Sequence, residues 1–351
     1  MRIAHRDIGD SHPAYIIAEI GVNHDGDPAR ALALVNAAAE AKADAIKLQL
    51  FRTDLLLSKA ARLAEYQRDA GEADPFEMLT RLELPDEAMR ACVRRAHELD
   101  LHAIVSVFSR ELVGPASEIG FDAFKSASPD VVNKPLLSAM VEAGKPLIVS
   151  TGTATLAEVT RANEWLAGQK NIAFLHCVSA YPTPPEQASL LGIAQLREAL
   201  AHRAVGYSDH TLELETGSIA VALGARLLEK HISHSIDAVG PDHASSLTPA
   251  QFAAYVRLVR HAEAMFGDRG KSPRAIEGDV RSLSRQSLIA ARDIAPGETL
   301  TPSDVTIKRP GAGLEPWRLD EVMGHTVIRP IASDTPILAD DLEGMAEGPS
   351  A

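Results

Sequence analysis

The sequence contains few of the residues on which disulfide-stabilised folds and thiolate metal sites depend. Only two of its 351 residues are cysteines, Cys92 in a predicted helix and Cys177 at the end of a predicted strand. Two isolated thiols supply neither a disulfide framework nor a thiolate metal site. We therefore interpret Cys177 as a small buried core residue, in preference to a catalytic nucleophile.

Positive charge and long apolar runs are also scarce. The chain has 35 lysines and arginines against 48 aspartates and glutamates, a formal net charge of -13. Because nucleic acids are bound through a basic face, this balance argues against a nucleic-acid partner. No apolar run approaches the roughly 20 residues that span a bilayer, and residues 1–10 are too polar for a secretory signal. We expect a cytoplasmic protein without a membrane partner, whose substrate can still be a small anion.

Short apolar runs alternate with helical patterns from residue 15 to about residue 266, which is typical of parallel β/α units. Eight such units with right-handed crossovers close into a TIM (β/α)8 barrel of roughly 250 residues, with reactive groups on the loops after the strands. The predicted strands are residues 15–20, 45–50, 103–107, 123–125, 146–150, 173–177, 204–207 and 227–230.

The helix between the first two runs illustrates the pattern. Asp27 suits the N-cap and Pro28 the first helical position. One face, predicted to pack against the barrel, carries Ala31, Leu34, Val35 and Ala38. Residues 52–83 are irregular, and we interpret them as an excursion that covers the site.

The composition changes after residue 266. Residues 267–274 are rich in glycine, proline, lysine and arginine, which is typical of a linker. Two short apolar runs, 287–291 and 305–308, follow, with a turn sequence at 293–298 between them. We predict a barrel domain at residues 1–267, a linker at 268–284 and a small second domain at 285–351.

Two histidines, His210 and His231, each follow a short apolar run although they lie 21 residues apart. Residues at the carboxyl ends of barrel strands point into one shared cleft, so these imidazoles are predicted to converge on one metal ion. The alternative to metal binding, for a single histidine, is a purely structural role as a hydrogen-bonded core residue. Asp242, in the turn at 240–243, carries a carboxylate back toward the same cleft.

These segments resemble the sialic acid synthase family. Further matching segments follow in order over nearly the whole chain: 17–24, 46–49, 124–128, 149–152, 175–177, 181–184 and 308–311. The resemblance implies a TIM barrel followed by a small antifreeze-like (SAF) domain. It also implies condensation of phosphoenolpyruvate with an N-acylated amino sugar, either N-acetylmannosamine or a 2,4-diacetamido-dideoxy hexose. The products would be phosphate and a nine-carbon 3-deoxy-2-keto sugar acid, formed by metal-assisted C–O cleavage.

Lys47 and Lys125 end predicted strands, where their ammonium groups can face an anionic ligand. A single strand-end lysine more often only extends to solvent. The resemblance implies that both lysines bind phosphoenolpyruvate, together with Gln49, Ser128, Ser150 and Ser208. It also implies that His210 and His231 hold a divalent metal, Mn²⁺ or Mg²⁺, with positions left open for water and the sugar aldehyde.

Two carboxylates, Glu19 and Asp242, are expected at the barrel mouth, where proton transfer requires that their pKa values differ. The resemblance implies that Glu19 positions or deprotonates the attacking water and that Asp242 orients a metal-bound water or a sugar hydroxyl. The catalytic residues would be Glu19, Asp242, Lys47 and Lys125. A strand-end carboxylate can instead form an ordinary salt bridge, which we expect for Glu229 beside Lys230.

The resemblance assigns the amino sugar to Asp130, Ser179, Tyr181, Asp242 and Arg309. The family's sialic acid formers carry glutamate in place of Asp130 and asparagine in place of Ser179. A threonine beside the phosphate is absent, since the chain has Val107 there. The resemblance also implies that Arg309 reaches the partner's barrel in a domain-swapped homodimer, where its planar guanidinium can hold a carbonyl oxygen.

Several alternatives stay open. Legionaminate synthesis fits the departures at Asp130 and Ser179 nearly as well as neuraminate synthesis. Pseudaminate synthases are expected to resemble the chain less, because they usually lack the segments that match 240–243 and 309–311. A non-catalytic carbohydrate-binding or coat polysaccharide protein could use the same fold, and a different aldolase could use Lys125 as a Schiff-base nucleophile.

Overall fold

A computed structural model describes residues 1–267 and 270–346. The chain divides into two compact units, Met1–Gly267 and Asp268–Ala351, and each is considered by itself. Residues 268, 269 and 347–351, which belong to our predicted linker and second domain, lie outside the described residues.

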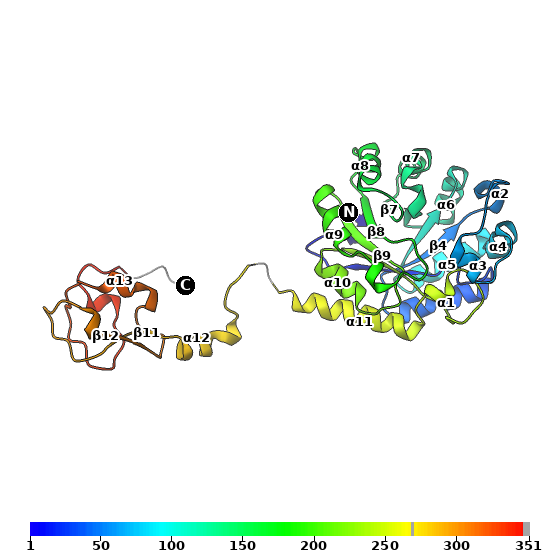
Figure 1. Cartoon of the computed structure of the whole chain (residues 1–351). Coiled ribbons are helices and arrows are strands. Elements are labelled where there is room, and N and C mark those ends of the chain that lie inside the picture. Colours follow the sequence, from blue (N-terminus) through cyan, green and yellow to red (C-terminus); the bar gives the residue numbers. More distant parts are fainter. Residues whose placement is uncertain (268–269, 347–351) are drawn as a thin grey trace. The chain divides into compact units, whose positions relative to one another are not determined.

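The first unit is a closed barrel of eight parallel strands, ringed by helices (Figure 1). This confirms the predicted fold, and the predicted strand ends differ from the observed ones by at most two residues. The barrel strands are β3 (Tyr15–Glu19), β4 (Ala45–Leu50), β5 (His102–Val107), β6 (Ala123–Ser126), β7 (Leu147–Ser150), β8 (Ile172–Cys177), β9 (Ala204–Asp209) and β10 (Leu227–His231). In this ring β10 pairs with both β3 and β9.

The surrounding helices bury apolar faces against the strands. In the first of them, Asp27 accepts hydrogen bonds at the N-cap, Pro28 begins the helix, and the four predicted residues are buried, as expected. The surrounding helices are α1 (Pro28–Glu40), α5 (Asp86–Glu98), α6 (Val113–Ile119), α7 (Lys134–Glu142), α8 (Leu156–Trp165), α9 (Leu191–Ala199), α10 (Thr216–Ala222) and α11 (Pro249–Met265).

The interior of the barrel is divided into an apolar lower layer and a polar upper layer. The lower layer joins apolar side chains of seven strands to Ile3 and Ile8. Ile3 belongs to the hairpin of β1 (Arg2–Ile3) and β2 (Arg6–Asp7), and Ile8 follows that hairpin. Its strand residues are Tyr15, Ile17, Ala45, Ile104, Ala123, Ile148, Ala173, Leu175 and Leu227. The amino end of the barrel is therefore filled, and polar groups gather toward the carboxyl end.

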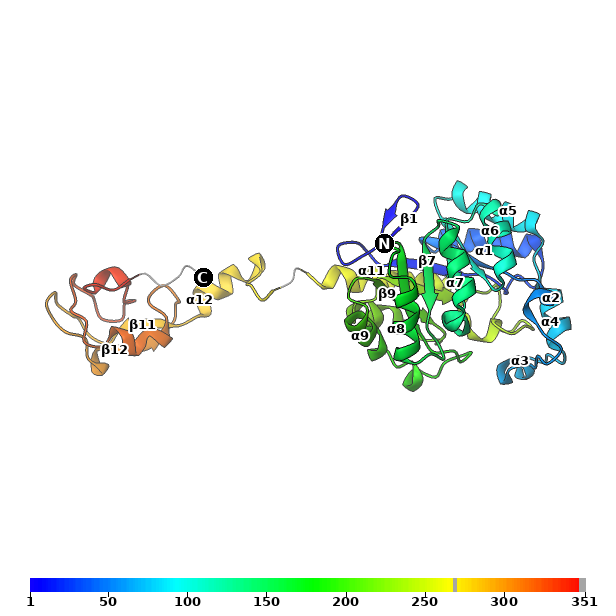
Figure 2. The ribbon, with the colours of Figure 1, turned by 90° about the horizontal axis from the view of Figure 1, so that it is seen from above.

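The segment after β4 forms three short helices, α2 (Thr53–Leu56), α3 (Glu65–Asp69) and α4 (Pro75–Leu82). They lie together on one side of the barrel (Figures 1 and 2). A small apolar cluster that includes Phe51, Met78 and Leu82 anchors the segment. No helix of the described residues is long and apolar enough to cross a membrane.

The second unit contains an antiparallel pair of strands, β11 (Ser287–Ala290) and β12 (Val305–Lys308), and a short helix, α13 (Leu319–Val322). The two predicted apolar runs are therefore strands. Its separate core includes Leu288, Val322 and Ile337. The range that we predict as linker contains a helix, α12 (Gly278–Ser284), whose Val280 and Leu283 side chains are exposed.

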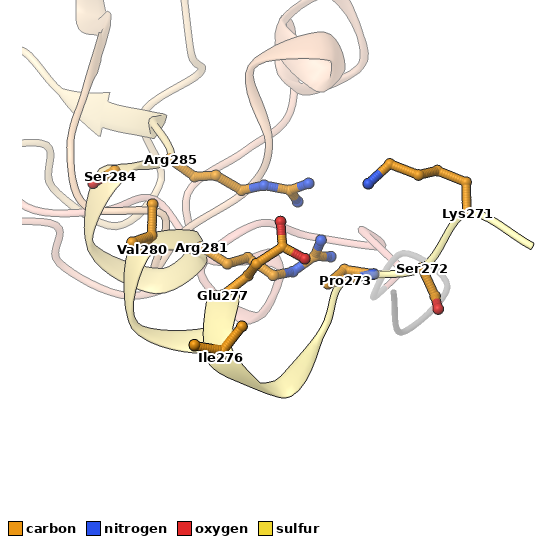
Figure 3. Close-up of a pocket in the computed structure, with 9 residues that line it drawn as sticks. All are labelled: Lys271, Ser272, Pro273, Ile276, Glu277, Val280, Arg281, Ser284 and Arg285. Atoms are coloured by element: carbon orange, nitrogen blue, oxygen red, sulfur yellow. The ribbon is translucent and has the colours of Figure 1, made fainter. Parts of the chain in front are cut away.

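Figure 3 shows a pocket of about 590 Å³ beside α12, within the second unit. Its lining is mixed, with exposed apolar groups and three basic side chains, Lys271, Arg281 and Arg285. No residue that we predict for catalysis, metal binding or substrate binding lines this pocket. The residues predicted for catalysis and metal binding all belong to the barrel unit.

Candidate active site

The upper layer of the barrel follows from strand geometry. Alternate residues of a strand point to opposite faces, so the inward positions continue from the apolar lower layer at steps of two. From Ile17 the next inward residue is Glu19, and from Leu227 the next two are Glu229 and His231. The same step leads to Lys47, Ser106, Lys125, Ser150, Cys177 and Ser208.

Glu229 joins the two lysines that we predict for phosphoenolpyruvate. Its Oε1 lies 3.3 Å from Lys125 Nζ and 3.7 Å from Lys47 Nζ, and it accepts a hydrogen bond of 3.2 Å from Ser208 Oγ. All four side chains are buried. The expectation that Glu229 pairs with adjacent Lys230 is wrong, because the two side chains lie on opposite faces of β10.

Lys47 lies between two carboxylates. Its ammonium forms an ion pair with Glu19 as well as Glu229, and it donates a hydrogen bond of 3.0 Å to Ser106 Oγ. Burial lowers the pKa of Lys47, but Glu19 and Glu229 outweigh burial and raise it. The lysine is therefore firmly cationic, as an anion-binding group must be.

Glu19 is a buried carboxyl held at one orientation. Gln49 Nε2 donates hydrogen bonds to Glu19 Oε1 (3.0 Å) and to the Gly21 carbonyl (2.9 Å). Burial raises the pKa of Glu19 to about 7; Lys47 opposes this shift and Glu229 adds to it. A carboxyl that titrates near neutral pH suits a general base.

A second polar group surrounds Gly152, after β7. Ser128 Oγ donates a hydrogen bond of 3.0 Å to Ser150 Oγ. A Cβ at Gly152 would collide with Ser179 Oγ and would lie 2.8 Å from Ser128 Oγ and 3.0 Å from Cys177 Sγ. Ser179 therefore lies close to the predicted phosphoenolpyruvate serines, and only glycine at position 152 leaves room for this arrangement.

The two predicted metal ligands face each other across the ends of β9 and β10. The ring centroids of His210 and His231 lie 5.3 Å apart with an interplanar angle of 67°. His210 Nδ1 donates a hydrogen bond of 2.9 Å to the Val178 carbonyl, which leaves its Nε2 as the nitrogen able to bind an ion. His231 Nδ1 is buried without a hydrogen-bond partner. Burial and the charges of His210 and Lys47 lower the pKa of His231 well below its usual value, so its imidazole is neutral.

These features fit a divalent cation with two imidazole ligands. In the part of the chain that the structure describes, no group of three or more histidine, cysteine, aspartate or glutamate side chains is arranged to hold a metal ion. Open coordination positions on the ion would therefore remain for water or substrate oxygen. The orphaned nitrogen of His231 is the observation that favours a ligand here, because buried polar atoms rarely lack a partner.

Asp242 approaches the imidazoles from the loop after β10. Its Oδ2 lies 3.6 Å from His231 Nδ1, and its carbonyl accepts hydrogen bonds from Ser246 Oγ (2.6 Å) and Ser245 Oγ (3.0 Å). Burial raises the pKa of Asp242 to about 6, against the lowering effects of His210 and Lys47. The site thus contains two carboxyl groups, Glu19 and Asp242, that titrate above the ordinary range.

Aromatic rings extend the site toward the mouth. The Tyr181 ring lies 4.1 Å from that of His210 and 4.9 Å from that of Tyr66. Tyr66 belongs to α3, so the excursion at 52–83 does reach the site. Asp130 lies in the turn after β6, where its Oδ1 accepts a hydrogen bond of 3.2 Å from Asn133 Nδ2 and burial raises its pKa.

The remaining predicted residues lie elsewhere. Arg309 is an exposed residue of the second unit. Val107 is fully buried in the core between strands and helices, away from the inward face.

Sequence reasoning missed three contributors to this site. Glu229 and Ser106 were detectable, because each lies an even number of residues from another inward position of its strand. Tyr66 carried no comparable signal, since its segment lacks a regular pattern. Cys177 is buried as expected, but its Sγ lies 3.8 Å from His210 Nδ1. Burial raises the pKa of the Cys177 thiol. The opposing effects of His210, Ser128 and Lys125 are larger and lower this pKa to about 7.

The fold and site define a class of protein: a β/α barrel that gathers lysines, carboxylates and two imidazoles at its carboxyl end, followed by a small β module. The model of the NeuB family matches residues 34–271, and that of the SAF domain matches residues 285–343. The chain belongs to the NeuB family, and the resemblance drawn from its motifs is confirmed.

Named relatives differ in their stated products. The chain is 34% identical to N,N'-diacetyllegionaminic acid synthase of Campylobacter jejuni serotype O:2, over 91% of this chain and 97% of the relative. It is 33% identical to pseudaminic acid synthase of Campylobacter jejuni serotype O:23/36, over 90% of this chain and 93% of the relative. The two identities differ by one percentage point, so this pair does not test the expected lower resemblance to pseudaminate synthases.

The structure is also similar to that of an N-acetylneuraminic acid synthetase from Leptospira borgpetersenii, solved in complex with citrate. The TM-score is 0.73 and the identity 29%, over 80% of this chain and 94% of that chain.

Proposed function

We propose that the chain condenses phosphoenolpyruvate with an N-acylated amino sugar and releases phosphate, forming a nine-carbon 3-deoxy-2-keto sugar acid. The observation that carries this proposal is the convergence of Lys47, Lys125, Glu19 and the His210–His231 pair at one end of one barrel. Family membership supports the same reaction class.

The lysines and serine hydroxyls of the site bind phosphoenolpyruvate. Lys47 and Lys125 supply two ammonium groups for a substrate that carries a carboxylate and a phosphate, and Ser128, Ser150 and Ser208 offer hydroxyl donors beside them. Glu229 holds both ammonium groups in place before the substrate arrives, which reduces the reorganisation required on binding.

His210 and His231 would hold the divalent cation, Mn²⁺ or Mg²⁺, which when bound polarises the aldehyde oxygen of the open-chain sugar as a Lewis acid. Carbon three of phosphoenolpyruvate then forms a bond to the aldehyde carbon, and water adds to carbon two. Glu19 takes a proton from that water, since it is the buried carboxyl whose pKa lies near 7. The tetrahedral intermediate loses phosphate by cleavage of the C–O bond and leaves the keto acid.

The sugar lies toward the mouth of the barrel. Asp242 orients a water molecule or a sugar hydroxyl, and Tyr181, Asp130 and Ser179 contact the acceptor. Arg309 contacts the acylamido group from the second unit of a partner chain, in a domain-swapped homodimer. Holding both reactants in a fixed orientation supplies much of the rate, with effective molarities of ~10⁵ M or more for aligned groups.

The acceptor is either N-acetylmannosamine or a 2,4-diacetamido-dideoxy hexose. Asp130 and Ser179, both shorter than the residues of the family's sialic acid formers, leave more room for a second acetamido group. The legionaminate-type acceptor is therefore the one to test first.

Purified protein mixed with phosphoenolpyruvate, Mn²⁺ and a panel of N-acylated amino sugars tests the proposal. Phosphate release and the mass of the keto acid are measured together. Turnover of the diacetamido sugar alone would exclude neuraminate synthesis, whereas no phosphate release with any acceptor would refute the proposed reaction.

The ion pairs of the site argue against two other functions. Lys125 Nζ lies 3.3 Å from Glu229 Oε1, so the nitrogen that a Schiff base would need is already engaged in a buried ion pair. Borohydride in the presence of substrate is expected to trap no adduct. A non-catalytic carbohydrate-binding protein has no need for a buried carboxyl, two paired lysines and two facing imidazoles together.

A further inference from the structure

A buried ion pair lies directly behind the two imidazoles. Asp209 precedes His210 and Lys230 precedes His231 in the sequence, so strand alternation directs the charged pair to the outer face of the barrel and the imidazoles to the inner face. Lys230 Nζ lies 2.9 Å from Asp209 Oδ2, and neither side chain has any exposed surface. The two residues are register partners on neighbouring strands β9 and β10.

Hydrogen bonds connect this pair to Thr211, the residue that follows His210. Asp209 Oδ1 accepts from Thr211 N (2.9 Å) and Thr211 Oγ1 (2.8 Å), and Lys230 Nζ donates to the Thr211 carbonyl (2.5 Å). The residues on both sides of His210 are therefore tied to the residue that precedes His231. Thr216 Oγ1 donates a further hydrogen bond of 2.5 Å to Asp209 Oδ2.

Stability alone does not account for charges at this place. Burying two ions costs desolvation energy that their attraction often fails to offset, and apolar residues of similar volume are frequently as stable. The neighbouring outward positions of the same strands, Tyr207 and Leu228, belong to the apolar core. Directional bonds, unlike apolar packing, define where the two strand ends lie relative to each other.

We propose that the Asp209–Lys230 pair fixes the separation of the His210 and His231 imidazoles and thereby sets the affinity of the site for a divalent cation. This inference rests on the proposed function, because it takes these imidazoles to hold the ion. Asp209 and Lys230 are positioning residues, since neither faces the barrel interior.

The double variant Asp209→Asn/Lys230→Met in the full chain tests the proposal. It removes the ion pair without leaving one charge buried alone, so the variant is expected to keep its fold. Titration with Mn²⁺ alone, followed by calorimetry, is expected to show binding about 10–100-fold weaker than in the unmodified chain, the usual effect of losing a residue that orients a metal ligand. Saturating Mn²⁺ is expected to restore most of the turnover.

A control ion pair, less buried than Asp209–Lys230, lies at the amino end of the barrel. Asp44 Oδ2 and Arg260 form an ion pair of 2.8 Å that contacts neither imidazole. The variant Asp44→Asn/Arg260→Met is expected to bind Mn²⁺ like the unmodified chain, whatever its melting temperature. Equal losses of Mn²⁺ affinity in both double variants would overturn the proposal, because general loosening of the barrel would then explain them.

Two further outcomes separate this inference from the function on which it rests. If Asp209→Asn/Lys230→Met binds Mn²⁺ within twofold of the unmodified chain while His210→Ala does not, the ion pair has no positioning role and the metal site stands. If His210→Ala binds Mn²⁺ as well as the unmodified chain, the metal site itself is refuted and the positioning role falls with it.

Discussion

The rate of condensation is expected to depend on a single carboxyl group that titrates near neutral pH. Burial raises the pKa of Glu19 from 4.5 to about 7, which corresponds to roughly 3 kcal/mol against its ionised form. A base acts only when ionised, so kcat/KM for phosphoenolpyruvate is expected to fall about tenfold for each pH unit below 7 and to level off above it. A carboxyl with an ordinary pKa would leave the rate at pH 6 almost unchanged.

The assay is phosphate release at low phosphoenolpyruvate concentration between pH 5.5 and 8.5, for the unmodified chain and for Glu19→Gln. The substrate phosphate and Asp242 also titrate near pH 6, so only the part of the profile that the two proteins do not share belongs to Glu19. Glu19→Gln is expected to lose a factor of about 10²–10⁴ in kcat/KM and to lack the limb near pH 7. The control Glu198→Gln, an exposed position on α9, is expected to keep the full profile. The same limb in Glu19→Gln as in the unmodified chain would show that Glu19 is not the base.

Three other predictions follow from the site. Lys47→Met leaves Glu19 and Glu229 without their shared cation, so the free energy of unfolding is expected to fall by about 3–5 kcal/mol in urea titrations. Adding Glu19→Gln to this variant should recover part of the loss. An unchanged urea midpoint for Lys47→Met would contradict the buried pairing. Lys125→Met is expected to raise KM for phosphoenolpyruvate about 10–100-fold, the cost of one charge-assisted contact, in steady-state assays, and an unchanged KM would remove Lys125 from the anion site. Tyr66→Ala is expected to raise KM for the amino sugar and to leave KM for phosphoenolpyruvate unchanged. The reversed pattern would show that the sugar does not bind beside Tyr66 and Tyr181.

Much of the barrel was predictable because parallel strands are buried on both faces and appear as short, nearly continuous apolar runs. The capped helix at Pro28–Glu40 followed from Asp27, Pro28 and the apolar face that begins at Ala31. The segment at 52–83 could not be predicted in detail, because its short helices depend on a local apolar cluster and show no sustained period. The helix Gly278–Ser284 was missed for a related reason, since a polar segment with exposed apolar side chains resembles a linker in composition.

Within the site, inward-facing residues were accessible to sequence reasoning, but their partners were not. Glu229 lies two residues before His231, so its direction follows from strand alternation. Its distances to Lys47 and Lys125 depend on how far each strand is staggered around the closed barrel, which no local pattern reports. The Asp209–Lys230 pair depends on the register of β9 and β10 in the same way.

The two-layered interior places the apolar lower layer apart from the residues that we propose to contact the acceptor. Ile17, Ile104 and Ile148 fill the lower layer, whereas Ser179 carries a buried hydroxyl without a hydrogen-bond partner and contributes little apolar contact. Substitutions at Ser179 and Asp130 therefore leave the apolar lower layer intact. A change of acceptor specificity would therefore start from small substitutions at these two positions, with the apolar residues beneath them unchanged.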